Sequence, residues 1–287
     1  MFVLRLMSWV VLVTLLLFSV LMKNSNGLLL FTALAALGVF GVICEACTML
    51  QNTGRHAYKV SSAIIATIMV VFVMRGADIT TIFMMITLFI MFNWIILLFS
   101  GLDEAVLDKV INSAAITFML TVPMMCIGLI YTIGEGDTYM GRNYLLYLII
   151  VTKIGDTAAY IVGTLSNKIL KGKNHKIVPD ISPKKSWEGT IGGLILSTLI
   201  SVIFWLILID NEVSAANIII PIVAGILLFI GGFSGDLVES VFKRICKVKD
   251  SAKIIPGMGG VFDVVDSLIF NAPIFYFFLK VFIIKEI

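Results

Sequence analysis

Long apolar segments recur along the whole chain, and they constrain its fold more than any other feature. Most are about 20 residues long, the length that an α-helix needs to cross the hydrocarbon core of a bilayer, and only the third is clearly shorter. The mean hydropathy is +1.07 and 14% of the residues are charged, against about 25% in an average soluble domain. This composition excludes a soluble globular protein and a disordered chain. We therefore predict an all-α polytopic membrane protein with about nine transmembrane helices, at Phe2–Met22, Gly27–Leu50, Val60–Met74, Ile79–Ser100, Ile111–Ile133, Tyr144–Leu165, Thr190–Ile209, Ala215–Phe233 and Asp263–Phe282.

The basic residues are distributed unevenly between the predicted loops. If the N-terminus is cytoplasmic, the great majority of the Lys and Arg residues fall on the inner side, most of them in segments 166–189 and 243–262. The outer loop Asp210–Ser214 contains none. The positive-inside rule then predicts a cytoplasmic N-terminus and, with nine spans, a C-terminus on the outer side. The expected location is a cell inner or plasma membrane, which the chain crosses several times.

The polar residues divide the chain into two regions. Up to residue 136 the sequence is typical of a plain membrane scaffold, whereas polar side chains concentrate between Lys153 and Ser267. We predict an N-terminal transmembrane scaffold at 1–136. The C-terminal transmembrane region, 137–287, would be catalytic and would carry the two basic cytoplasmic loops.

Four polar residues follow the eighth apolar run at helical spacing. Asp236, Glu239, Ser240 and Lys243 stand at positions i, i+3, i+4 and i+7 and would form one stripe on a helix. A charge at the bilayer centre costs at least about 2.5–3.5 kcal/mol, so such a stripe indicates a functional site. The glycines just before it would allow either a close approach of another backbone or a break in the helix; they are Gly231, Gly232 and Gly235.

Two further carboxylates, Asp263 and Asp266, are three residues apart at the start of the ninth run. A hairpin of these two helices would bring Asp236 and Asp263 together at the cytoplasmic boundary. Clustered carboxylates repel one another unless a cation lies among them. Mg²⁺ is bound by one or two carboxylates that leave room for water and phosphate. The sequence therefore predicts a Mg²⁺ site at Asp236 and Asp263.

Other charged residues within the spans allow two interpretations. Lys153, Asp156 and Tyr160 share one helix face, where they form either an ion pair that packs helices or the polar lining of a site. Glu45 is isolated in its span, and we interpret it as a structural polar contact.

The loop 170–189 is strongly basic, with lysines at 171, 173, 176, 184 and 185. It is expected to touch anionic lipid or to bind phosphate. Ser186 is predicted to cap the following helix, and Gly192 and Gly193 to permit close helix packing. The glycine-rich turn 256–260 is expected to present backbone N–H groups to an anion.

The segment from Ser240 to Ser267 resembles the C-terminal signature of phosphatidate cytidylyltransferases, also called CDP-diacylglycerol synthases. That signature runs S-x-x-K-R, four residues, K-D, a Gly-Gly turn and D-R-x-D. The residues that match it are Ser240, Lys243, Arg244, Lys249, Asp250, Pro256, Gly257, Gly259, Gly260, Asp263 and Asp266. Three segments upstream also resemble this family: DTAAY at 156–160, SPKKSWEG at 182–189 and SGD at 234–236.

Two residues depart from this signature. Met258 and Val264 stand where the family usually has His and Arg. A phosphate monoester is already largely a dianion at pH 7, since its second pKa is about 6. We therefore expect that no His is needed as a general base, and that the missing Arg weakens a phosphate or carboxylate contact.

The resemblance implies a reaction of CTP with phosphatidate that gives CDP-diacylglycerol and pyrophosphate in phospholipid biosynthesis. It implies one or two Mg²⁺ ions, held by Asp236 and Asp263. Asp266 would either contact these ligands without touching the ion or bind a second ion. Catalytic roles are implied for Asp263, Asp266, Lys249 and Asp250. The implied substrate-binding residues are Asp156, Ser182, Lys184, Lys185, Glu188, Ser240, Lys243, Arg244, Gly257, Gly259 and Gly260.

Other functions remain open at this point. The same transfer could be made to another lipid phosphate, such as that of an isoprenoid ether lipid, and the departures at Met258 and Val264 fit a non-catalytic paralogue. A secondary transporter could use Lys153, Asp156 and Asp236, although the charges gather on one side and no inverted repeat is visible. The expected partners are CTP, phosphatidate and the bilayer, and no nucleic acid. No motif decides for or against a homodimer.

Overall fold

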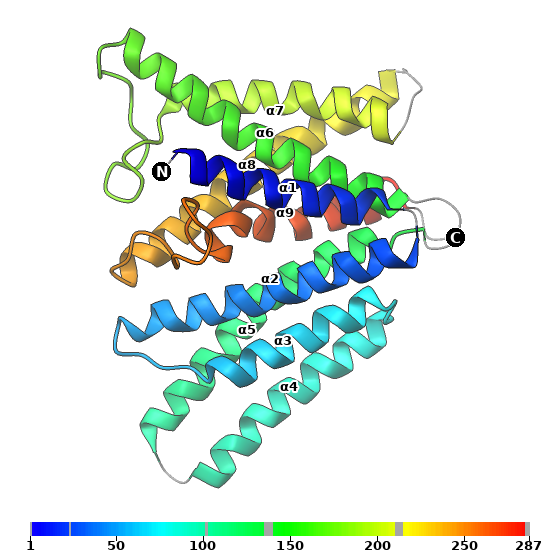
Figure 1. Cartoon of the computed structure of the whole chain (residues 1–287), viewed down its shortest axis with the longest axis vertical. Coiled ribbons are helices and arrows are strands. Elements are labelled where there is room, and N and C mark those ends of the chain that lie inside the picture. Colours follow the sequence, from blue (N-terminus) through cyan, green and yellow to red (C-terminus); the bar gives the residue numbers. More distant parts are fainter. Residues whose placement is uncertain (1, 23, 101–102, 135–139, 210–214, 285–287) are drawn as a thin grey trace. The chain divides into compact units, whose positions relative to one another are not determined.

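The computed structural model describes the chain except for residues 1, 23, 101–102, 135–139, 210–214 and 285–287. The predicted outer loop Asp210–Ser214 thus lies outside the described residues. The prediction of an all-α protein is confirmed, because the described ranges form nine helices (Figure 1). They are α1 (Phe2–Leu21), α2 (Ser25–Gln51), α3 (Lys59–Met74), α4 (Ile79–Ser100), α5 (Glu104–Tyr131), α6 (Met140–Ile169), α7 (Trp187–Leu208), α8 (Ala215–Ile245) and α9 (Val261–Phe282).

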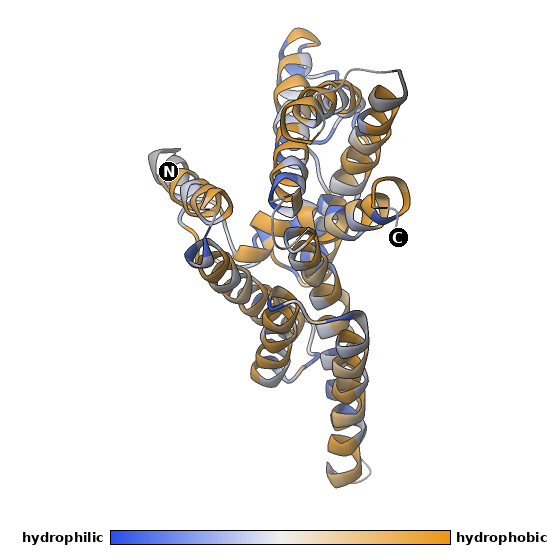
Figure 2. Cartoon of the chain, turned by 90° about the vertical axis from the view of Figure 1, so that its right-hand side faces the viewer, coloured by the Kyte–Doolittle hydropathy of each residue, from blue (hydrophilic) through white to orange (hydrophobic). Residues whose placement is uncertain are grey.

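Seven of these helices are long and apolar enough to cross a membrane. The other two are α3, which has 16 residues, and α1, whose apolar segment among the described residues is Met7–Leu21. Apolar residues dominate the helices (Figure 2), and on α4 the side chains of Leu98 and Phe99 are 77% and 83% exposed. Water disfavours so large an apolar surface, whereas lipid accepts it. The chain is therefore a multi-pass membrane protein.

Polar side chains mark where several helices begin. The side chain of Asn24 accepts a hydrogen bond from the Gly27 N–H (3.1 Å) at the start of α2. Ser186 accepts one from the Gly189 N–H (3.2 Å) at the start of α7. The predicted cap at Ser186 is thus confirmed, and it fixes the point at which the basic loop joins α7.

The chain forms two compact units, which we describe separately. The first comprises Met1–Thr132 and Phe242–Val265, and the second comprises Ile133–Val241 and Asp266–Ile287. The division passes through α8 and α9, so each of these helices contributes residues to both units.

In the first unit α2 packs against α3 and α5. Val42 and Ile43 on α2 are fully buried, and Phe31 of α2 stacks on Tyr131 of α5 with ring centroids 4.4 Å apart. Between apolar helices in lipid, such close packing supplies the attraction that exclusion of water supplies in soluble proteins. This packing holds α2 in place and, with it, the buried Glu45.

In the second unit α6 and α7 approach closely through small residues. A Cβ atom on Gly189 would lie 2.7 Å from the Ala159 carbonyl oxygen, and one on Gly193 would lie 2.7 Å from Ala159 Cβ. The expectation of close packing at this part of α7 is therefore confirmed. This contact holds the start of α7, where the basic loop ends, against α6.

The helix α8 is longer than predicted, since it continues past Phe233 to Ile245. The polar stripe therefore lies on a continuous helix, and the glycines before it do not break it. Gly235 instead allows close approach, because a Cβ there would lie 2.8 Å from the Asp266 carbonyl oxygen. The predicted apolar span ended at Phe233, and the structure shows that the stripe, which its spacing placed on a helix, continues that same helix.

Candidate functional site

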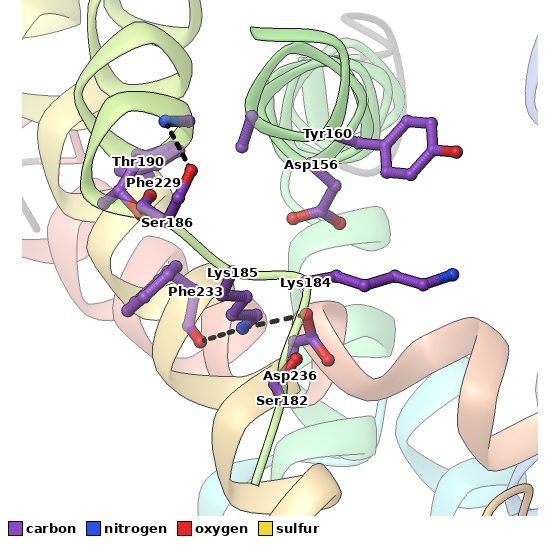
Figure 3. Close-up of a pocket in the computed structure, with 12 residues that line it drawn as sticks. Asp156, Tyr160, Ser182, Lys184, Lys185, Ser186, Thr190, Phe229, Phe233 and Asp236 are labelled. Atoms are coloured by element: carbon purple, nitrogen blue, oxygen red, sulfur yellow. Dashed lines mark hydrogen bonds and ion pairs between the residues drawn. The ribbon is translucent and has the colours of Figure 1, made fainter. Parts of the chain in front are cut away.

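A cavity of about 190 Å³ lies in the second unit, between α6, the basic loop, α7 and α8. Figure 3 shows the Asp156 carboxylate and the Lys185–Asp236 pair at this cavity. Its lining includes five residues to which sequence analysis gave a role in substrate or metal binding, namely Asp156, Ser182, Lys184, Lys185 and Asp236. The fold thus brings together residues that are up to 80 positions apart in the sequence, as between Asp156 and Asp236.

Lys185 contacts a carboxylate, a backbone carbonyl and an aromatic ring at the cavity. Its Nζ lies 2.9 Å from Asp236 Oδ2, donates to the Phe233 carbonyl (3.3 Å) and stands 4.2 Å from the centre of the Phe233 ring. The side chain is only 16% exposed, whereas Lys184 beside it is exposed. A lysine held in this way offers a fixed positive charge next to a carboxylate.

Glu188 fastens the basic loop to the start of α7. Its carboxylate accepts the His175 N–H (3.0 Å) and lies 2.8 Å from His175 Nδ1, while the Trp187 N–H donates to the His175 carbonyl (2.9 Å). Nearby, Lys176 and Ser186 form an isolated β-bridge. The structure therefore gives Glu188 a protein partner; its predicted contact with substrate stays a prediction.

A group of three carboxylates lies in the second unit. Asp236 and Glu239 come from α8 and Asp266 from α9, and one oxygen of each lies within 4.8 Å of the others. Glu239 is 3% exposed. Sequence analysis placed Glu239 on the polar stripe without a role, and the signal that could have found it was its spacing of three residues from Asp236.

Lys153 on α6 balances part of this negative charge. Its Nζ lies 3.8 Å from Asp156, 3.9 Å from Asp266 and 2.9 Å from the Ser267 hydroxyl. The predicted pair of Lys153 and Asp156 is present, and the same lysine also contacts α9. It therefore links the two helices that carry Asp156 and Asp266.

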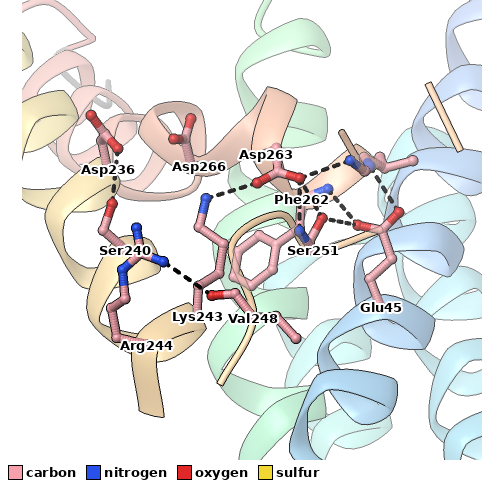
Figure 4. A network of polar contacts seen from close by, with 12 residues as sticks. Glu45, Asp236, Ser240, Lys243, Arg244, Val248, Ser251, Phe262, Asp263 and Asp266 are labelled. Carbon is pink, nitrogen blue, oxygen red and sulfur yellow. Dashed lines mark hydrogen bonds and ion pairs between the residues drawn. The ribbon is translucent and has the colours of Figure 1, made fainter. Parts of the chain in front are cut away.

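In the first unit Asp263 is the centre of a second polar network (Figure 4). Lys243 Nζ donates to its Oδ1 at 2.7 Å, and its Oδ2 accepts the backbone N–H groups of Ser251 (2.9 Å) and Gly260 (2.7 Å). The side chains of Lys243 and Asp263 are 14% and 10% exposed. Two predicted site residues thus form a nearly buried ion pair, and its further partner Ser251 was not found from the sequence.

The glycine-rich turn closes on itself. Gly257 and Gly259 have positive φ angles of 77° and 101°, which favour glycine. The Gly259 N–H donates to the Ile255 carbonyl (3.2 Å), and the Gly260 N–H donates to Asp263. Two N–H groups of the turn that was expected to face an anion, those of Gly259 and Gly260, therefore have acceptors within the chain.

The other predicted residues lie on or just after α8. Ser240 stands 3.5 Å from Asp236 Oδ1. The Arg244 guanidinium donates to the Val248 carbonyl (3.3 Å). Lys249 and Asp250 are exposed beyond the end of the helix. Their predicted roles stay predictions.

The chain is similar to a known protein family and to several known proteins. A family model described as the cytidylyltransferase family matches residues 3–282. The chain is 41% identical over 155 residues to a phosphatidate cytidylyltransferase of Staphylococcus haemolyticus, covering 52% of this chain and 56% of that protein. It is 38% identical over 162 residues to a phosphatidate cytidylyltransferase of Bacillus subtilis, covering 55% of each. It is also 39% identical over 140 residues to the uncharacterized protein YnbB of Escherichia coli, covering 49% of this chain and 43% of that protein. The chain spans about half the length of the curated relatives it matches.

Proposed function

Because this chain belongs to the cytidylyltransferase family, we propose that it transfers the cytidylyl group of CTP to phosphatidate. The products are CDP-diacylglycerol and pyrophosphate, and the pathway served is phospholipid biosynthesis. The resemblance read from the C-terminal motifs is confirmed by the family match, which extends it into the N-terminal half. The observation that carries the proposal at the level of residues is the cavity, where Lys185 faces Asp236 beside Asp156.

The reaction requires the protein to position the two substrates and to neutralise the charge of their phosphate groups. A phosphatidate oxygen attacks the α-phosphorus of CTP, the bond from that phosphorus to the bridging oxygen breaks, and pyrophosphate leaves with the electron pair. The attacking oxygen is already largely anionic at pH 7, because the second pKa of a phosphate monoester is about 6. No protein base is needed, and fixed cations such as Lys185 would hold the phosphates in line.

The residues of the second unit fit a divalent cation. Three carboxylates offer oxygen atoms within 4.8 Å of one another, and hard oxygen donors are the ligands that Mg²⁺ prefers. We propose that Asp236, Glu239 and Asp266 hold Mg²⁺, which when bound neutralises charge on the transferring phosphate. The role of Asp263 as a metal ligand, taken from the sequence, stays a prediction.

The activity is tested with purified protein in lipid nanodiscs, radiolabelled CTP and phosphatidate. We expect CDP-diacylglycerol to form with Mg²⁺, to stop forming when EDTA is added, and to form again when Mg²⁺ is restored. A parallel reaction with an isoprenoid ether lipid phosphate measures the lipid preference. Product from that lipid alone would reject phosphatidate as the substrate, and no product from either would reject the proposed function.

We propose that the basic loop faces the cytoplasm, which the concentration of lysines there supports. A cysteine replacing the exposed Lys173 is expected to react with a membrane-impermeant maleimide only from the cytoplasmic side. One replacing Asn211, outside the described residues, is expected to react only from the opposite side. The unmodified protein gives the background from its four native cysteines. Labelling of both positions from one side would contradict the proposed orientation.

A further inference from the structure

Glu45 on α2 is buried, at 4% exposure. Its carboxylate accepts three hydrogen bonds from a segment more than 200 residues later (Figure 4). The donors are the Val261 N–H (2.8 Å), the Phe262 N–H (2.9 Å) and the Ser251 hydroxyl (2.7 Å). A buried carboxylate is tolerated only where such donors replace water. Two of these three donors are N–H groups of the first turn of α9, which have no acceptor within their own helix.

Gly260 immediately precedes α9, at the position of the helix cap. A Ser, Thr, Asp or Asn there would ordinarily offer a side-chain oxygen to the first turn. Gly260 has no side chain, and a Cβ atom built on it would clash with Glu45 Oε2 and with Ser251 Oγ. Glu45 therefore fills the space of the missing cap side chain and accepts the bonds that such a side chain would accept.

Asp263 belongs to the same turn and shares a partner with Glu45. The Ser251 hydroxyl lies 2.7 Å from Glu45 Oε2 and 2.8 Å from Asp263 Oδ2. A hydroxyl has only one proton to donate. The two carboxylates therefore share the Ser251 proton, and a change at one of them alters the hydrogen bond to the other. A change at Glu45 would therefore reach both the Gly260 N–H and the Ser251 hydroxyl, which hold the Asp263 carboxylate beside Lys243.

We propose that Glu45 is a positioning residue for the reaction. It fixes the first turn of α9 and, through Ser251, sets the orientation of the Asp263 carboxylate. The consequence for turnover rests on the proposed function, whereas the hold on the turn does not. The experiment therefore has one arm without substrate and one arm with it.

The first arm measures backbone hydrogen exchange in substrate-free protein. Glu45→Gln keeps the length of the side chain, but its amide nitrogen cannot accept a bond from an N–H group. We expect the peptide covering 251–263 to exchange about tenfold faster or more, as when a hydrogen bond to a charged group is lost. Cys47→Ala, a change at another buried position of α2, should leave that peptide unchanged. Unchanged exchange in Glu45→Gln would overturn the proposal.

The second arm measures steady-state kinetics with CTP and phosphatidate. A loss of folded protein lowers kcat alone, whereas displacement of a turn that contacts substrate, as the family resemblance implies for Gly257, Gly259 and Gly260, also raises KM. We expect Glu45→Gln to lower kcat/KM for CTP about tenfold, with a KM raised about threefold or more, and Cys47→Ala to stay within about twofold of the wild type. Faster exchange with wild-type kinetics would overturn the positioning role.

A further variant guards against failure of Glu45→Gln to fold. Ser251→Ala leaves Glu45 in place but removes the hydroxyl that couples it to Asp263. It should raise KM for CTP in the same direction, and wild-type kinetics in this variant would overturn the proposal. If the wild type itself makes no CDP-diacylglycerol, the proposed function fails, while the exchange arm still decides whether Glu45 holds the turn.

Discussion

Asp236→Asn is expected to abolish turnover, lowering kcat by on the order of 10²–10³-fold or more. Asp236 takes part in both polar features of the second unit, because it pairs with Lys185 at 2.9 Å and belongs to the group of three carboxylates. An amide has no negative charge to offer to either a cation or a lysine. The measurement is kcat at saturating CTP and Mg²⁺, together with the melting temperature of each protein.

The chain offers a matched control in Asp180, an exposed carboxylate in the basic loop. Asp180→Asn removes the same charge near the same lysines and is expected to keep kcat within about twofold of the wild type. If Asp236→Asn retained more than about a tenth of the wild-type kcat, both the metal assignment and the role of the cavity would be wrong.

The neighbouring lysines of the basic loop are expected to respond very differently to the same substitution. Lys185→Met removes an ammonium group that contacts Asp236, the Phe233 carbonyl and the Phe233 ring. We expect kcat/KM for CTP to fall about a hundredfold, since bonds between charged groups contribute about 1.5–3 kcal/mol each. Lys184→Met removes an exposed charge, and a fall of about tenfold or less is expected.

Steady-state kinetics over a range of CTP concentrations separate these two outcomes. The difference between the two variants should also depend on ionic strength, because salt screens an exposed charge strongly and a nearly buried charge much less. The loss in Lys184→Met should therefore shrink at high ionic strength, while the loss in Lys185→Met persists. Equal losses in the two variants would show that the cavity does not define the site.

Helical periodicity explains why much of the architecture could be predicted. Apolar runs of bilayer length located the helices, and the cap at Ser186 followed from residue type alone. The spacing of Asp236 and Glu239 placed both on one face of α8, and the structure finds them in one carboxylate group. Each of these inferences uses neighbours within one or two helical turns, where backbone geometry dictates which residues share a face.

Contacts between distant segments could not be predicted in this way. Glu45 is the only charged residue of its helix, so no local pattern could identify partners more than 200 residues away. Lys153 was paired with Asp156 from spacing, yet its contact with Asp266 depends on how α6 and α9 pack. The choice at Gly235 between close approach and a helix break stayed open for a related reason, because the Asp266 carbonyl that lies against it comes from another helix.

The empty side-chain position at Gly260 also restricts how this sequence can drift over evolutionary time. Any side chain gained at 260 would compete with Glu45 and Ser251 for the same space, and a shortened residue at 45 would leave the first turn of α9 without its acceptor. Neither change is harmless alone, whereas a capping residue at 260 combined with a smaller residue at 45 could restore both the packing and the hydrogen bonds. Lineages that lack Gly260 should therefore also lack Glu45, with the two positions inherited as a pair.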